Sequence, residues 1–188
     1  IEPSQAGKII EDTYQDPLIG QVLGDKYRVE EELGQGGFGT VYSARQLAVE
    51  RDVALKVLNL PEHLPREHHS MLVARFQREA QATSTLKHPN TVTLIDYGHD
   101  NSGNLFLVLE LLEGRDLKTL IRQEAPLDSR RAANIASQIC RSLANAHDRK
   151  IIHRDLKPEN IFVSDFEGVS DFVKVLDFGI AKLMDSQQ

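Results

Sequence analysis

The residues best suited to do chemistry lie in the run His153-Arg154-Asp155-Leu156-Lys157-Pro158-Glu159-Asn160. Within this run Asp155 can act as a base, Lys157 can face a phosphate, and Asn160 offers an amide ligand. Asp177 follows in Asp-Phe-Gly, and its carboxylate is a hard oxygen ligand of the kind that Mg²⁺ prefers. Few structural needs explain this density of functional groups. We therefore interpret the segment as part of a catalytic centre.

A glycine-rich run, Gly34-Gln35-Gly36-Gly37-Phe38-Gly39, fits the pattern G-x-G-x-x-G, which is weak evidence alone. A dinucleotide-binding fold needs a helix directly after the glycines, whereas Thr40-Val41-Tyr42 continues as a strand. Two interpretations remain: a flexible hairpin turn, and a flap whose backbone N–H groups approach phosphate. The strand Val53-Ala54-Leu55-Lys56, which ends in a lysine, favours the flap.

The elements that must position these residues are strands first and helices later. Residues 24–112 show strand patterns, including Thr91–Tyr97 and Leu105–Leu112, with one helix from about His68 to Leu86. After Gly114 we expect a short helix and then a longer one with Asp128 as its N-cap. Residues 1–20 are polar and lack periodicity, so we expect a mostly disordered leader.

The helix at 68–86 carries a misfit in its buried stripe, which runs Leu72, Phe76, Glu79, Thr83 and Leu86. A carboxylate among apolar residues needs a cation, because an unpaired buried charge costs several kcal/mol. We expect Lys56, at the end of the preceding strand, to pair with Glu79.

Taken together, the motifs resemble those of eukaryotic-like (Hanks-type) protein serine/threonine kinases, in particular the bacterial branch, over about residues 20–184. The resemblance implies an α+β, protein-kinase-like fold of two lobes. The N-lobe, residues 21–112, would hold an antiparallel sheet and one helix. Residues 113–188 would form an incomplete helical C-lobe, with the hinge at about 110–114.

Catalytic roles follow from this resemblance. Asp155 would orient a substrate hydroxyl and accept its proton, and Lys157 would reach the transferring phosphoryl group. Lys56 would hold the α- and β-phosphates of ATP, with Glu79 fixing Lys56. Asn160 and Asp177 would ligate Mg²⁺ or Mn²⁺.

The resemblance also implies a nucleotide site between the lobes. Its expected residues come from the flap, the neighbouring strands, the hinge and the catalytic segment: Leu33, Gly34, Gly36, Gly37, Phe38, Gly39, Val41, Ala54, Lys56, Leu109, Glu110, Leu112, Asn160, Phe162 and Asp177. Without the motifs, the apolar members of this set would be read as plain core. His153 and Phe178 would stack, with Leu94 and Thr83 completing the stack, and Arg154 would pair with a phosphorylated activation loop.

Composition excludes several other classes of function. The net charge of −6 argues against nucleic-acid binding, and no apolar run approaches the ~18 residues that span a bilayer. The single Cys140 is expected to be a buried residue in a reducing compartment. The remaining six histidines lack transition-metal spacing. We expect a cytoplasmic protein, or the cytoplasmic domain of a membrane-anchored parent.

Both ends of the sequence look cut, because it begins at Ile1 and stops at Gln188, before any activation segment. Two functions are therefore weighed. The first is a catalytic domain fragment that transfers the ATP γ-phosphoryl group to a protein Ser/Thr hydroxyl. The alternative is a truncated, pseudokinase-like module that binds nucleotide or a partner. The five intact residues Lys56, Glu79, Asp155, Asn160 and Asp177 favour the first for the parent, although the 188-residue fragment itself is expected to be inactive.

Overall fold

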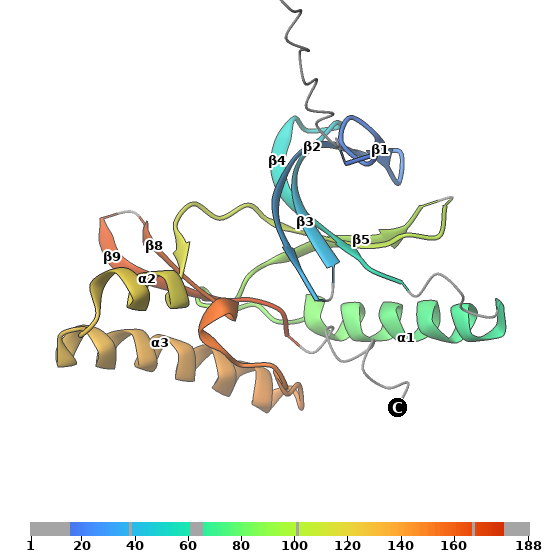
Figure 1. Ribbon diagram of the computed structural model, residues 1–188. Helices are drawn as coiled ribbons and strands as arrows, with labels where there is room; N and C mark the ends of the chain where they lie inside the picture. The colour runs from blue at the N-terminus through green and yellow to red at the C-terminus, as the bar shows by residue number, and fades with distance from the viewer. Residues whose placement is uncertain (1–15, 38, 61–65, 101, 167, 179–188) are drawn as a thin grey trace, which may run out of the picture.

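The computed structural model describes residues 16–37, 39–60, 66–100, 102–166 and 168–178. These residues form two lobes, each built on an antiparallel sheet (Figure 1). The first lobe has a six-stranded sheet in the order β1-β2-β3-β4-β6-β5 and one helix, α1. Its elements are β1 (Val22–Leu23), β2 (Tyr27–Gly36), β3 (Gly39–Gln46), β4 (Arg51–Leu58), α1 (Arg66–Ser84), β5 (Leu94–His99) and β6 (Leu105–Glu110).

The side chains of β3 alternate between the two faces of this sheet. Tyr42 and Ala44 are buried in a core cluster with Val29, Val53 and Val108. Val41, between Thr40 and Tyr42, must point to the opposite face because successive side chains alternate. The strand therefore carries core residues on one side and exposes Val41 to the space between the lobes.

Residues 16–20 differ from the expectation of a disordered leader over residues 1–20, whereas residues 1–15 lie outside the described residues. Residues 16–20 form a turn that packs on the sheet, and Leu18 and Ile19 lie against the first core cluster. Asp16 accepts hydrogen bonds from the backbone N–H of Leu18 (2.8 Å) and from the Tyr42 hydroxyl (2.7 Å). The prediction was wrong for residues 16–20 because their partly buried apolar side chains, Leu18 and Ile19, are too few to give the periodic pattern by which structure is predicted from sequence.

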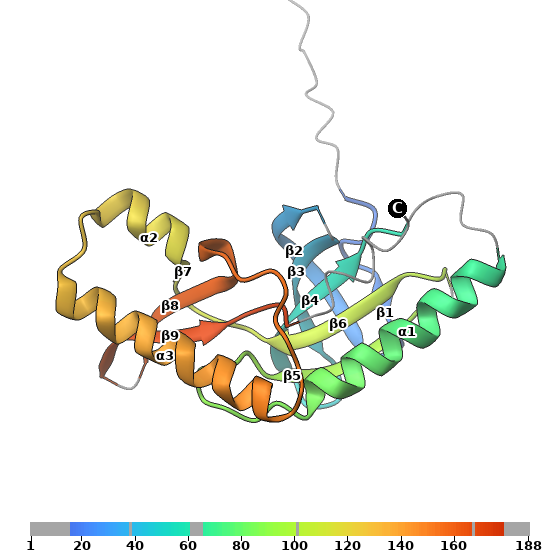
Figure 2. The ribbon, with the colours of Figure 1, turned by 90° about the horizontal axis from the view of Figure 1, so that it is seen from below.

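The second lobe contains a three-stranded sheet in the order β7-β8-β9 and two helices that lie beside it (Figure 2). Its elements are β7 (Arg115–Asp116), α2 (Leu117–Glu124), α3 (Ser129–Asp148), a 3₁₀ turn η1 (Pro158–Asn160), β8 (Ile161–Phe166) and β9 (Val169–Val175). Asp128 caps α3 as predicted, accepting from the N–H groups of Arg130 and Arg131. Ile135 and Ala146 of α3 pack on Ile161, Val173 and other residues of the sheet.

Cys140 lies on α3 but is exposed, so the expectation of a buried cysteine was wrong. The buried positions of this helix are Ile135, Gln138, Ser142 and Ala146, which recur at intervals of three and four residues. Cys140 falls between two of these positions and therefore points away from the sheet.

The segment between α1 and β5 joins the first lobe to the second through buried hydrogen bonds. The Asn90 amide donates to Gln138 Oε1 (2.9 Å) and to the Val173 carbonyl (2.8 Å), and all of these atoms are buried. Val92 N–H donates to the Val175 carbonyl, and Val175 N–H to the Asn90 carbonyl. Strand β5 therefore begins at Leu94 rather than at Thr91, because the preceding residues pair with the second lobe.

Candidate active site

A pocket of about 430 Å³ lies between the two lobes and gathers most of the predicted nucleotide-site residues. Val41, Ala54 and Lys56 approach from the first sheet, whereas Phe162 and Asp177 approach from the second lobe. The full lining consists of Leu33, Gly34, Val41, Ala54, Lys56, Val92, Leu109, Glu110, Leu111, Leu112, Gly114, Phe162, Leu176 and Asp177. Its walls are mainly apolar, and Lys56, Glu110 and Asp177 add charged groups to them, as in a site for a flat ring and an anionic tail.

The glycine loop connects β2 to β3 as a hairpin, and no helix follows it. Gly34 lines the pocket, whereas Gly36, Gly37 and Gly39 are not among the lining residues. Phe38 lies outside the described residues. At Gly39, with φ of +154°, a Cβ atom would stand 2.1 Å from the Val57 carbonyl oxygen, so glycine is required where the loop enters β3.

The catalytic segment places two predicted residues, Lys157 and Asn160, around the carboxylate of a third, Asp155. Lys157 Nζ lies 2.7 Å from Asp155 Oδ2, and Asn160 Nδ2 donates to the carbonyl (2.8 Å) and to Oδ2 (3.0 Å) of Asp155. The hydrogen bond from Lys157 is the main reason that the pKa of Asp155 is held below its usual range. Asp155 is therefore ionised at neutral pH and fixed in orientation.

His153 is part of the support for this segment. It is buried, and its ring packs on Phe178 with the centroids 4.8 Å apart. Nε2 lies 2.7 Å from the Leu176 carbonyl, which can only accept, so Nε2 carries a hydrogen. Nδ1 accepts from the Asp155 N–H at 3.3 Å, which requires the neutral ring. Burial lowers the pKa of His153, consistent with that state.

Lys56 has a different partner from the one predicted. Lys56 Nζ lies 2.6 Å from Asp177 Oδ2, and no ion pair joins Lys56 to Glu79, although the structure describes both residues. The expected Lys56–Glu79 pair is therefore absent from this conformation. Glu79 is only half-buried, so water can hydrate its carboxylate without an ion pair. Lys56 is only 8% exposed and needs a nearby anion, which the carboxylate of Asp177 supplies.

Thr83 and Leu94, the remaining members of the predicted stack with His153 and Phe178, lie in different surroundings. Thr83 Oγ1 donates to the Phe178 carbonyl at 3.4 Å, so this polar residue of the proposed stack contacts the backbone of Asp-Phe-Gly. Leu94, the fourth member, packs on the cluster that contains Phe76.

Arg154 is exposed, and both Arg154 (φ 67°) and Asp177 (φ 55°) adopt left-handed backbone conformations. Such strain is often concentrated at active sites.

Asn160 and Asp177 fit a cation site by their chemistry. Asn160 gives its amide nitrogen to Asp155, which leaves Oδ1 as its available oxygen, and the Leu176 N–H donates to the Asn160 carbonyl. The two residues therefore sit on segments joined directly by the backbone. No group of three His, Cys, Asp or Glu side chains forms a metal cluster within the described ranges. The remaining ligands of a cation here would come from phosphate and water, as Mg²⁺ sites commonly allow.

Four pocket residues were not predicted: Val92, Leu111, Gly114 and Leu176. Leu176 could have been found, because it directly precedes Asp177. Gly114, with φ of +142°, lets the chain pass close to β8, since a Cβ there would stand 2.5 Å from the Val163 carbonyl oxygen. Val92 gives no such signal, because its position depends on the pairing between the lobes.

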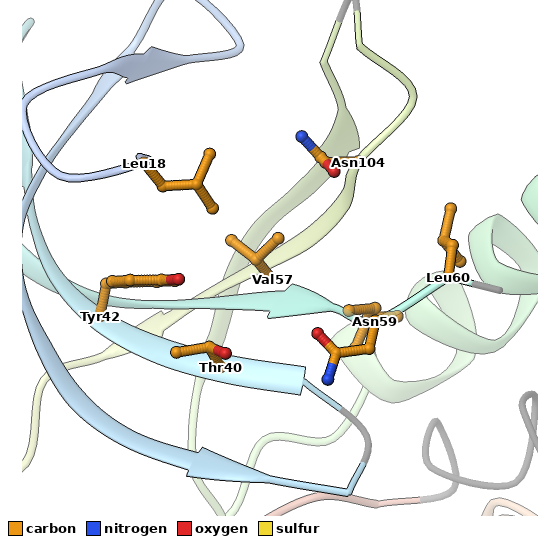
Figure 3. Close-up of a pocket in the computed structure, with 8 residues that line it drawn as sticks. Leu18, Thr40, Tyr42, Val57, Asn59, Leu60 and Asn104 are labelled. Carbon is orange, nitrogen blue, oxygen red and sulfur yellow. The ribbon is translucent and has the colours of Figure 1, made fainter. Parts of the chain in front are cut away.

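A second cavity, of about 380 Å³, lies on the opposite face of the first sheet (Figure 3). Leu18, Thr40, Tyr42 and Val57 surround it, with Asn104 across the opening. Thr40 and Tyr42 face this cavity from the strand whose Val41 lines the pocket between the lobes. The turn at residues 16–20 therefore supports strand β3 at Tyr42, on the face opposite the pocket between the lobes.

Comparisons with known proteins agree with this geometry. The family model described as "Protein kinase domain" matches residues 27–188. Serine/threonine-protein kinase pkn3 of Myxococcus xanthus is 46% identical over 176 residues, 91% of this chain and 30% of that protein. Serine/threonine-protein kinase PrkC of Bacillus subtilis is 37% identical, covering 90% of this chain and 25% of that protein.

Among solved structures, a point mutant of the kinase domain of Mycobacterium tuberculosis PknI superimposes with a TM-score of 0.71 and 26% identity. The match covers 86% of this chain and 62% of that one. The chain thus spans 30% or less of the length of the two curated relatives. The predicted fold class and the resemblance to the bacterial branch are confirmed.

Proposed function

Because this chain belongs to the protein kinase domain family, we propose that it supplies the nucleotide site and catalytic loop of an ATP-dependent protein serine/threonine kinase. The reaction transfers the γ-phosphoryl group of ATP to a Ser or Thr hydroxyl of a protein. The observation that carries this proposal is the position of Asp155, whose Oδ2 lies 2.7 Å from Lys157 and 3.0 Å from Asn160. Since ATP is an intracellular nucleotide, the domain would act in the cytoplasm.

In this proposal the pocket between the lobes takes the nucleotide. The adenine ring lies between Val41 and Ala54 on one side and Phe162 on the other, and the backbone of residues 110–112 meets its polar edge. The phosphates extend toward Lys56 and Asp177. No helix in the described part of the chain is long and apolar enough to cross a bilayer.

The charged side chains of the site would each have a defined role in phosphoryl transfer. Asp155, ionised and oriented, accepts a hydrogen bond from the attacking hydroxyl and takes its proton. Lys157 leaves Asp155 to contact the transferring phosphoryl group, where its charge stabilises the transition state. Asn160 and Asp177 would hold Mg²⁺ or Mn²⁺, which supplies charge neutralisation on the phosphates. Asp177 must therefore give up Lys56, which becomes available to the α- and β-phosphates and to Glu79.

The test is Asp155→Asn in the full-length protein that contains this chain. Phosphoryl transfer from radiolabelled ATP to a protein acceptor should fall by about 10²–10⁴-fold, the range for a general base. Asp165→Asn, an exposed change on β8, is the matched control and should retain turnover. Full turnover in Asp155→Asn would contradict the assignment. A wild-type protein that binds ATP but transfers no phosphoryl group would instead support the non-catalytic module.

A further inference from the structure

The side chain of Glu110 is unusual among the pocket residues because it is bound on two sides. Its Oε1 accepts a hydrogen bond from the Thr93 N–H at 2.7 Å and lies 2.7 Å from Lys174 Nζ. The Glu110 N–H in turn donates to the Thr93 carbonyl at 3.1 Å. Glu110 and Thr93 thus form a closed ring of two hydrogen bonds, which fixes the direction of the carboxylate before Lys174 reaches it.

These contacts join three segments that meet at the nucleotide pocket. Glu110 ends β6 and lines the pocket, Thr93 belongs to the link between α1 and β5, and Lys174 lies on β9. Strand β9 leads through Leu176 to Asp177, three residues after Lys174. The ion pair therefore connects the segment beside the adenine edge to the strand that delivers the carboxylate at the phosphate end.

The Glu110–Lys174 ion pair is partly buried. The Lys174 side chain is 15% exposed and that of Glu110 is 28% exposed, so bulk water screens the charges only in part. Burial by itself would raise the pKa of Glu110, but the hydrogen bonds from Lys174 and Thr93 outweigh it and the net pKa is lowered. By contrast, the Lys26–Asp96 pair of the first lobe has a lysine that is 60% exposed.

We propose that Glu110 and Lys174 are positioning residues that hold the hinge at a fixed distance from Asp177, and so set the affinity of the pocket for ATP. The inference rests on the proposed function for the identity of the ligand. Neither side chain contacts the reacting atoms in this account. Their effect should therefore appear in nucleotide binding and in the KM for ATP more than in kcat.

The experiment measures binding of a fluorescent ATP analogue to the full-length protein, with and without Mg²⁺, for wild type, Lys174→Gln and Lys174→Arg. Lys174→Gln should bind about tenfold more weakly, equivalent to about 1.4 kcal/mol, and Lys174→Arg should recover most of the loss. The KM for ATP should rise in parallel, with kcat changed less than KM. Lys26→Gln, which breaks the exposed pair, is the matched control and should bind as wild type does.

A double-mutant cycle with Glu110→Gln separates this role from general destabilisation. If the pair acts as a unit, Lys174→Gln should add little to the loss already caused by Glu110→Gln. Equal binding by wild type and Lys174→Gln, or tighter binding and faster turnover by the variant, would overturn the inference. Because the fluorescence titration reports binding independently of turnover, its failure is distinct from a failure of the proposed function, which would be absence of transfer by a protein that binds ATP.

Discussion

His153 shows how a single buried side chain can make the catalytic segment sensitive to pH. Its neutral ring donates from Nε2 to Leu176 and accepts at Nδ1 from the Asp155 N–H, so protonation removes the second bond. Burial lowers the pKa below the ordinary value of about 6.5. The unfolded chain therefore binds more protons than the folded chain in the window below 6.5, and acid must destabilise the fold.

We expect the free energy of unfolding of the wild-type protein to decrease as the pH falls from about 7 to about 5.5, the range in which an ordinary histidine gains its proton. His153→Phe keeps a ring against Phe178 but cannot titrate, so its stability should depend less on pH over the same window. Urea unfolding at several pH values measures the difference. His88, whose pKa burial also lowers, titrates in both proteins and cancels in the comparison. Equal pH slopes for the two proteins would rule out this role for His153.

At the scale of elements, strand β3, which follows the glycine loop, is supported by the turn at residues 16–20. Tyr42 is buried, and its hydroxyl donates to Asp16 Oδ2 at 2.7 Å. Burial first, and the bond to Asp16 second, raise the pKa of Tyr42 to about 12, so the phenol remains a donor at any physiological pH. Strand β3 is thereby fixed on the face opposite Val41.

Removing that hydroxyl should loosen the support without creating a cavity. Tyr42→Phe is expected to cost about 1 kcal/mol and to lower the Tm by about 2–4 °C for a domain of this size. Asp16→Ala should cost more, because it also removes the hydrogen bond from the Leu18 N–H, and the double variant should cost little more than Asp16→Ala, because the Tyr42–Asp16 bond is lost in both. Tyr97→Phe, whose ring packs on Phe76, is the control. Fully additive losses in differential scanning calorimetry would show that the two residues act separately.

The elements also show which features a sequence can predict. The Asp128 cap, the strand after Gly39 and the helix near Phe76 follow from local patterns, and the structure contains all three. The helix boundaries shift by about two residues, to Arg66–Ser84, a common uncertainty at helix ends. The partner of Lys56 could not be predicted in this way, because Glu79 and Asp177 compete for it and the choice depends on how the lobes meet. The Glu110–Lys174 pair could not be predicted for the same reason, since 64 residues separate its members.

At the scale of the whole molecule, the lobes are joined by groups that water does not reach. Asn90 and Gln138 are each 4% exposed, and Gln138 Oε1 accepts from both Asn90 and the Val173 N–H. Gln138 also donates to the Asp171 carbonyl at 2.7 Å. Because a buried polar group left without a partner costs about 1–3 kcal/mol, this network favours one relative placement of the lobes over others.

Asn90→Ala should therefore affect both lobes, although only one residue changes. The Val173 carbonyl loses the Asn90 donor, and we expect a loss of about 1–3 kcal/mol in the free energy of unfolding. Hydrogen exchange should become faster at Val175 and in the segment before β5, because the paired backbone between them opens more often. Asn104→Ala, in the β5–β6 hairpin, should change exchange only near that hairpin. Unaltered protection at Val175 in Asn90→Ala would show that the apolar contacts alone hold the lobes together.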